Sequence, residues 1–127
     1  MTNLNYVAPC FIVEDVRVSV AFYVDKLGFE LRYIAPEEGP FFAIVGREKI
    51  SIMLKAIAPD IKPIPNHTRH QWARLDAWIS ATDPDALFEE YSSKGITFHQ
   101  PLKDDDGLRG FEVKDADGYV LFFGRPK

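Results

Sequence analysis

Residues 15–29, DVRVSVAFYVDKLGF, decide the fold of the first half of the chain. Asp15 is a candidate helix N-cap, because its carboxylate accepts backbone N–H groups that have no partner inside the helix. Tyr23 and Leu27 have helical spacing and share one face, and Gly28 suits the left-handed turn that ends a helix. The intervening valines alternate as they do in a strand and are poor helix formers. The start and stop signals nevertheless favour a helix.

The same start and stop signals recur in the second half of the chain. Asp83 is a candidate N-cap, and the following Pro84 suits the first helical position. Leu87 and Tyr91 lie on one apolar helical face, and Gly95 ends the helix. Each predicted helix follows one apolar segment and precedes three more. This order indicates an internal duplication of a strand–helix–strand–strand–strand unit.

The composition limits the class of protein and the kinds of partner. With 127 residues, of which 46% are hydrophobic, the chain is long enough for one domain with a packed core. A net charge of −4 argues against a nucleic-acid partner, which needs a basic surface. Cys10 is the single cysteine, so no internal disulfide forms and a reducing cytoplasm is expected. No apolar run is long enough to span a membrane, and the N-terminus lacks a signal-peptide pattern.

The apolar segments predict an α+β domain over residues 1–127 with two modules, residues 4–57 and 72–126. The predicted strands are residues 6–13, 29–35, 41–45, 50–56, 72–81, 96–99, 109–114 and 119–125. Residues 58–71 contain three prolines and are predicted to link the modules. Residues 100–107, with three consecutive aspartates, are predicted to be a solvated loop.

Four motifs in order resemble the glyoxalase/bleomycin-resistance/dioxygenase superfamily, also called vicinal oxygen chelate proteins. They are Glu14-Asp15, Phe22-Tyr23 with Leu27-Gly28-Phe29, Asp83 with Gly95-Ile96, and Asp115-Ala116-Asp117-Gly118-Tyr119. The family's last turn usually has proline where this chain has Ala116. The resemblance implies two βαβββ modules that form a curved mixed sheet around a groove. It also implies a homodimer.

Metal enzymes of this family hold a divalent ion with side chains from four strands. The resemblance places the corresponding positions at Ala8, Asp76 and Phe122, and less securely at Met53. Hard divalent cations need oxygen or nitrogen donors. Alanine and phenylalanine have none, methionine offers only a thioether, and one aspartate cannot make a site. We therefore expect no metal ion and no other cofactor.

The remaining side chains predict an aromatic and apolar groove. This composition resembles the bleomycin-resistance branch of the family, whose members bind a drug without catalysing a reaction. The expected ligand-binding residues are Ala8, Cys10, Ile12, Phe42, Met53, Trp72, Asp76, Trp78, Arg109 and Phe122, with Phe41, Phe98 and Phe111 as further candidates for the rim. Such a groove suits a flat, partly cationic small molecule. Asp76 is either the acidic group of the groove or a carboxylate paired with Arg74 or Arg109. The direction of the Arg109 side chain is not fixed by the sequence.

Two enzymatic hypotheses stay open beside the binding protein. The first is a metal-dependent lyase or dioxygenase of the glyoxalase type with other ligands. Its available donors are Asp76, His67, His70, His99, Glu112 and Asp115. The second is a metal-independent enzyme that uses Asp76 or His99 as a general base. The missing metal ligands favour the binding protein.

Overall fold

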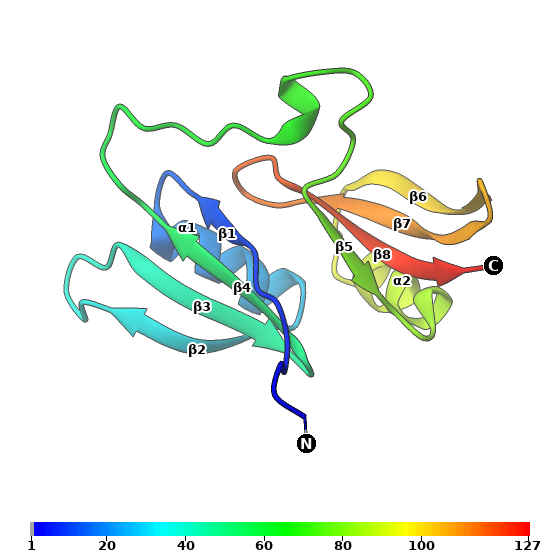
Figure 1. Ribbon diagram of the computed structural model, residues 1–127, viewed down its shortest axis with the longest axis horizontal. Helices are drawn as coiled ribbons and strands as arrows, with labels where there is room; N and C mark the ends of the chain where they lie inside the picture. The colour runs from blue at the N-terminus through cyan, green and yellow to red at the C-terminus, as the bar shows by residue number, and fades with distance from the viewer. Residues whose placement is uncertain (1) are drawn as a thin grey trace. The chain divides into compact units, whose positions relative to one another are not determined.

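The computed structural model describes residues 2–127. The chain forms two compact units, Met1–Pro63 and Ile64–Lys127. Each unit contains a four-stranded sheet and one principal helical segment (Figure 1). The boundary between the units falls within residues 58–71, the proline-containing segment.

The first unit follows the order strand, helix and three strands. Its elements are β1 (Cys10–Ile12), α1 (Val16–Ala21), the π-helical turn η1 (Phe22–Lys26), β2 (Glu30–Ala35), β3 (Phe42–Arg47) and β4 (Ile50–Lys55). The sheet order is β1-β4-β3-β2, with β1 parallel to β4 and the other pairs antiparallel. The predicted helix is confirmed, and the strand interpretation of the valine run is wrong.

The second unit repeats this topology. Its elements are the short 3₁₀ turn η2 (Asn66–Thr68), β5 (Ala77–Ser80), α2 (Pro84–Ser93), β6 (Phe98–Asp105), β7 (Leu108–Lys114) and β8 (Val120–Pro126). The sheet order is β5-β8-β7-β6, and β5 is parallel to β8. The predicted α+β fold with two βαβββ modules is therefore confirmed.

The helix ends form where the sequence predicts them. The Asp15 carboxylate accepts the N–H groups of Arg17 and Val18, and the Asp83 carboxylate accepts that of Ala86 at 3.1 Å. Glycines with φ of +72° and +71° follow the two helical segments at Gly28 and Gly95. Within residues 2–127, no helix combines the length and the apolar character needed to cross a membrane.

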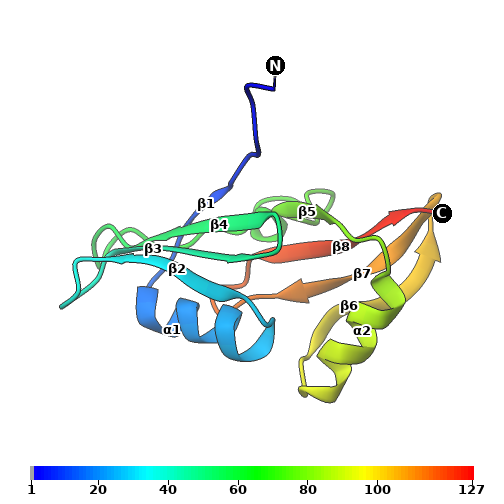
Figure 2. The ribbon, with the colours of Figure 1, turned by 90° about the horizontal axis from the view of Figure 1, so that it is seen from below.

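In each unit the helix packs against one face of its own sheet (Figure 2). The first unit buries Ala43, Val45, Ile52 and Leu54 on the face toward α1. In the second unit the ring of Tyr91, from α2, packs edge-on against those of Phe111 and Phe123, with ring centroids 6.0 and 5.7 Å apart. Strand alternation sends the intervening residues to the opposite face of each sheet, here called the open face.

The first strand of each module is shorter than predicted. Residues 6–9 lie outside β1, because Pro9 has no N–H to donate to a ladder, although its carbonyl accepts the N–H of Met53 at 2.9 Å. Residues 72–76 lie outside β5. There the Asn66 side chain binds the carbonyl of Leu75, so this part of the backbone contacts the turn η2, and hydrogen bonding to β8 begins at Asp76, whose N–H binds the Val120 carbonyl at 2.8 Å.

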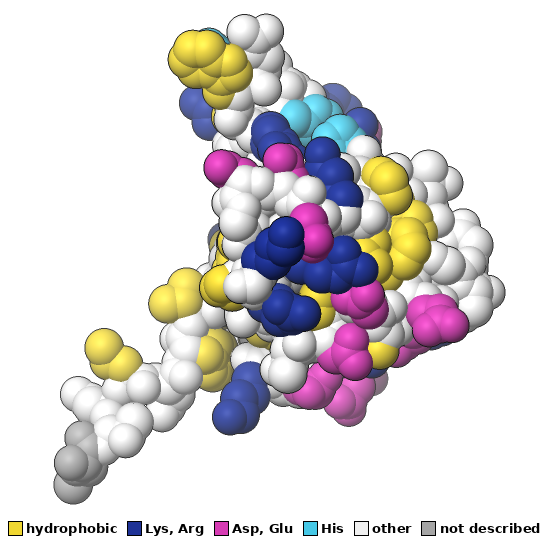
Figure 3. Space-filling view, turned by 90° about the vertical axis from the view of Figure 1, so that its right-hand side faces the viewer, with side chains coloured by type: hydrophobic (Ala, Val, Ile, Leu, Met, Phe, Trp, Pro, Cys, Tyr) yellow, Lys and Arg dark blue, Asp and Glu magenta, His cyan; other side chains and the backbone are white. Residues whose placement is uncertain are grey.

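The prediction of a solvated loop over residues 100–107 is wrong, because most of it belongs to β6 and only the turn at Asp106 and Gly107 lies outside a strand. This edge strand needs hydrogen bonds on one side only, so it tolerates Pro101. Its charged side chains make local ion pairs, such as Lys103 with Asp105 at 3.5 Å. On the face drawn in Figure 3, basic and acidic side chains lie next to one another, in keeping with such pairs.

Candidate functional site

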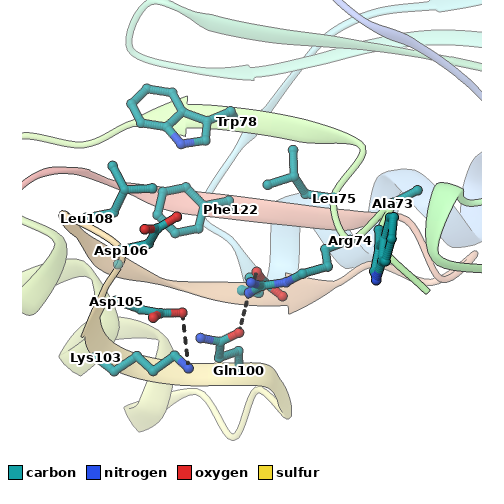
Figure 4. Close-up of a pocket in the computed structure, with 13 residues that line it drawn as sticks. Ala73, Arg74, Leu75, Trp78, Gln100, Lys103, Asp105, Asp106, Leu108 and Phe122 are labelled. Atoms are coloured by element: carbon teal, nitrogen blue, oxygen red, sulfur yellow. Dashed lines mark hydrogen bonds and ion pairs between the residues drawn. The ribbon is translucent and has the colours of Figure 1, made fainter. Parts of the chain in front are cut away.

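A hollow of about 400 Å³ lies on the open face of the second sheet (Figure 4). Its floor comes from the central strands β7 and β8, and its sides come from β5, β6 and the segment before β5. The lining residues are Trp72, Ala73, Arg74, Leu75, Trp78, Gln100, Lys103, Asp105, Asp106, Leu108, Gly110, Glu112 and Phe122. All of them belong to the second unit.

A stacked pair of aromatic rings forms the apolar part of the hollow. Trp78 and Phe122 are register partners on β5 and β8, and their rings stack with centroids 5.7 Å apart and planes at 22°. The Phe122 ring lies over Gly110 and Gly124, where a methyl group would come within 2.5 and 2.6 Å of it. Trp78 remains 45% exposed. The pair therefore offers an open, flat surface on which a planar group can stack.

A buried carboxylate forms the polar part of the hollow. Glu112 is 1% exposed, and its Oε2 accepts a hydrogen bond from Arg74 Nη2 at 2.6 Å. The same nitrogen donates to Gln100 Oε1 at 2.5 Å (Figure 4). Among the described residues, Glu112 Oε1 has no hydrogen-bond partner. The site thus places one acceptor oxygen beside an aromatic surface.

One histidine, His99, lies next to this carboxylate, and a second, His67, lies next to His99. His99 Nε2 is 3.8 Å from Glu112 Oε1, too far for a hydrogen bond, and the His67 ring centroid is 5.8 Å from that of His99. His67 Nε2 lies 2.9 Å from the Gly118 carbonyl oxygen, so this nitrogen carries a hydrogen. Burial lowers the pKa of His99, with a further lowering from Lys114 that the charge of Glu112 opposes. His99 is therefore mainly neutral at pH 7.

Three of the predicted ligand-binding residues line this hollow: Trp72, Trp78 and Phe122. Four others lie on the open face of the first sheet. These are Cys10, Ile12, Phe42 and Met53, which pair in register with one another or with Lys55. Ala8 precedes β1 and is half-buried.

Asp76 lies beside the hollow but is not among its lining residues, and the backbone binds its carboxylate. Its Oδ1 accepts the N–H of Asn66 and its Oδ2 accepts the N–H of Val120, both at 2.8 Å. The prediction that Asp76 pairs with Arg74 or Arg109 is wrong, because the ion pairs of these arginines go to Glu112 and to Asp85 and Asp104. The buried acidic group in the lining of this hollow is Glu112, which the sequence indicated only as a possible metal donor.

Arg109 points to the side of the sheet that carries α2. Its Nε and Nη2 donate to the Asp85 carboxylate at 2.8 and 2.6 Å, and its Nη1 donates to Asp104 at 3.1 Å. These bonds raise the pKa of Arg109 and lower those of both aspartates. The rings of Phe98 and Phe111 also lie on this side, in contact with Phe88, and not at the rim. Strand alternation around Phe111 was the signal that could have placed Glu112, and not Arg109, in the hollow.

The fold agrees with the comparison with protein families. The sequence model of the Glyoxalase/Bleomycin resistance protein/Dioxygenase superfamily matches residues 3–123. The chain belongs to this superfamily. A comparison with curated proteins finds no relative.

Solved structures of the superfamily's fold resemble the chain over nearly its whole length. The bleomycin-binding protein of Streptomyces verticillus, complexed with copper(II)-bleomycin, is 27% identical over all of both chains, with a TM-score of 0.72. TioX from Micromonospora sp. ML1 is 20% identical over 96% of this chain and 98% of TioX, with a TM-score of 0.74. TnmS3, an antibiotic binding protein from Streptomyces sp. CB03234, is 20% identical over 100% and 98%, with a TM-score of 0.72. The two structures at 20% identity support the fold alone.

The residues that the resemblance assigns to the superfamily's metal positions do not fit a divalent cation. Ala8 and Phe122 have no donor atom, Met53 offers a soft thioether, and both oxygens of Asp76 bind backbone N–H groups. The alternative donor Asp115 binds the N–H groups of Asp117 and Tyr119. Within residues 2–127, no three His, Cys, Asp or Glu side chains are arranged to hold a metal ion.

Proposed function

We propose that this protein binds an aromatic small molecule non-covalently and without a metal ion, in the hollow of the second unit. The stacked Trp78–Phe122 pair is the observation that carries the proposal. It presents an exposed indole face above a ring that two glycines allow to lie flat on the sheet. Planar aromatic ligands gain both apolar burial and ring stacking on such a surface.

The comparison with solved structures supports the same class of function. The bleomycin-binding protein of Streptomyces verticillus, 27% identical over all of both chains, is described by its bound copper(II)-bleomycin. We therefore place the chain among the antibiotic-binding members of the superfamily. The lyase or dioxygenase alternative is less well supported, because no three His, Cys, Asp or Glu side chains within residues 2–127 are arranged to hold a metal ion.

The experiment is a titration of the wild-type protein with metal-free bleomycin and with indole, followed by calorimetry and by amide NMR shifts. We expect saturable binding of at least one probe, with shifts centred on β5 and β8. Trp78→Ala should weaken binding about fivefold to tenfold, since a stacked ring contributes about 1 kcal/mol or more. Phe41→Ala, which removes an exposed ring from the first unit, is the matched control.

Two results would overturn the proposal. The first is the absence of saturable binding of either probe to the folded wild-type protein. The second is an equal loss of affinity in Trp78→Ala and Phe41→Ala, which would place the ligand elsewhere.

We further propose that the protein is a homodimer. Leu4 and Val7 are 89% and 90% exposed, and with Tyr6 they form an apolar segment that a second copy would cover. Static light scattering measures the mass directly, and a monomer at micromolar concentration would contradict it. A cytoplasmic location stays a prediction from the single cysteine.

A further inference from the structure

We propose that the ligand of this hollow carries an N–H or O–H donor next to its aromatic ring, and that Glu112 Oε1 accepts the hydrogen bond. This inference rests on the proposed function and deepens it. It assigns Glu112 as the residue that determines specificity, and it defines the ligand as a planar ring system with an attached donor. Flat ligands without a donor would bind by stacking alone.

The two oxygens of Glu112 have different surroundings. Oε2 accepts a short hydrogen bond from Arg74, which balances the negative charge. Oε1 is buried and has no hydrogen-bond partner among the described residues, and His99 Nε2 lies 3.8 Å away from it. A buried acceptor without a hydrogen bond is unfavourable. A donor from the ligand would satisfy it once the half-exposed Arg74 side chain, which lines the same hollow, shifts aside.

The charges around the hollow favour a ligand that carries a hydrogen-bond donor over a ligand that carries an anionic group. Its lining contains two basic side chains, Arg74 and Lys103, and three acidic ones, Asp105, Asp106 and Glu112. Both basic groups already have acidic partners, at 2.6 Å for Arg74 and 3.5 Å for Lys103. A ligand carboxylate would therefore meet like charge, whereas an N–H or O–H group meets a free acceptor.

The strand register also places the acceptor Glu112 in line with the stacked rings of Trp78 and Phe122. Glu112 on β7 and Phe122 on β8 are register partners, and Phe122 is in turn the partner of Trp78 on β5. Carboxylate, phenyl ring and indole thus lie in one row across three neighbouring strands. A fused bicyclic ring that stacks on Trp78 or Phe122 can direct a ring N–H toward the carboxylate.

The test compares indole with benzofuran, two bicycles of nearly the same shape that differ by an N–H donor against an ether oxygen. We expect wild-type protein to bind indole about tenfold more tightly than benzofuran, which is the effect of one hydrogen bond to a charged group. Glu112→Gln offers a neutral and weaker acceptor and should reduce this preference. Glu112→Met removes the acceptor at similar volume and should abolish it. Affinities are measured by NMR titration or calorimetry.

Glu89→Gln is the matched control. It removes one negative charge from the same unit at an exposed position of α2, outside the lining of the hollow. It should leave the preference for indole unchanged. Thermal unfolding and far-UV circular dichroism establish that each variant is folded. If one Glu112 variant does not fold, the other variant and the wild-type ratio still decide the question.

The outcomes separate the inference from the proposed function. Equal binding of indole and benzofuran to the wild type, weakened equally by Trp78→Ala, would overturn the donor inference and leave the aromatic site intact. The same would follow if both Glu112 variants kept the full preference. Failure of both probes and of bleomycin to bind would overturn the proposed function and the inference with it.

Discussion

The open faces of the two sheets both use glycine to admit a neighbouring side chain, but with different results. In the first unit the Arg32 guanidinium lies over Gly46, and its donors reach the carbonyls of Glu48 and Ile50 and the hydroxyl of Ser51, at 2.8 to 3.1 Å. In the second unit Gly110 and Gly124 lie under the ring of Phe122, which stacks with the exposed Trp78. The same topology thus carries two different surfaces.

The two open faces differ in whether their polar side chains find hydrogen-bond partners within the protein. Arg32, on β2, donates to the carbonyls of Glu48 and Ile50 in the hairpin formed by β3 and β4, so its side chain stabilises the turn between these two strands. In the second unit the stacked rings expose an aromatic face, and Glu112 keeps one oxygen without a partner among the described residues. Duplicated modules can therefore diverge in role through a few side chains on one face. This contrast is why we assign the ligand to the second sheet.

Gly124→Ala is expected to have the largest effect on this contrast. The added methyl group would lie 2.6 Å from the Phe122 ring and 2.5 Å from the Arg109 carbonyl oxygen. The backbone oxygen cannot move without disturbing the ladder between β7 and β8. We expect a loss of about 3 kcal/mol in the free energy of unfolding, measured by urea denaturation. The displaced ring should also abolish measurable indole binding.

Gly46→Ala is the matched control in the first sheet. Its methyl group would meet the Arg32 side chain and, at 2.5 Å, the Ile50 carbonyl oxygen, so it should also destabilise the fold. Indole binding should persist in the folded fraction, because the Trp78–Phe122 pair is untouched. If Gly46→Ala abolished binding and Gly124→Ala did not, the assignment of the ligand to the second sheet would be wrong.

Asp76→Ala distinguishes the role of Asp76 from that of Glu112 and should have an intermediate effect on stability. It leaves the N–H groups of Asn66 and Val120 without their acceptor, which should cost about 2 kcal/mol in the free energy of unfolding. The exposed Asp60→Ala serves as a control and should change stability by less than about 0.5 kcal/mol. In Asp76→Ala the tighter binding of indole over benzofuran should survive. Loss of that preference would identify Asp76, and not Glu112, as the acceptor.

Most of the fold could be predicted from the sequence because its signals are local. Asp15 and Asp83 accept N–H groups two or three residues along the chain, and Gly28 and Gly95 end the helical segments through their own positive φ. The extent of β6 could not be predicted, because an edge strand with charged side chains lacks the apolar alternation that marks buried strands.

The candidate site was predictable only where strand alternation determines it. Trp78 and Phe122 face the hollow, as the family registration indicated. Arg74 was missed as a lining residue, because it lies in an irregular segment and meets Glu112 on β7 through a contact distant in sequence. The role of Asp76 also depends on a distant contact, with Val120 on β8. Neither contact has a signal in the local pattern.

The pH dependence of the free energy of unfolding near neutral pH should be the smallest of these effects. It should also distinguish the two units. All three histidines of the chain lie in the second unit. The pKa of His99 is lowered from the ordinary 6.5, so below that pH the unfolded chain takes up this proton before the folded chain does. The contribution of His99 to the free energy of unfolding should therefore be full above pH 6.5 and fall as the pH drops from 6.5 toward the folded pKa.

The charges that face His99 allow the direction of this effect to be tested with two variants of opposite sign. Lys114 lowers the pKa of His99 together with His67 and Arg74, whereas Glu112 raises it. Lys114→Met should therefore make the fall in stability below pH 6.5 shallower, and Glu112→Gln should make it steeper. Urea denaturation across pH 5 to 7.5, with His99→Asn as the reference without this group, measures the slopes. Identical slopes in all three variants and the wild type would mean that His99 titrates alike in the folded and unfolded chains.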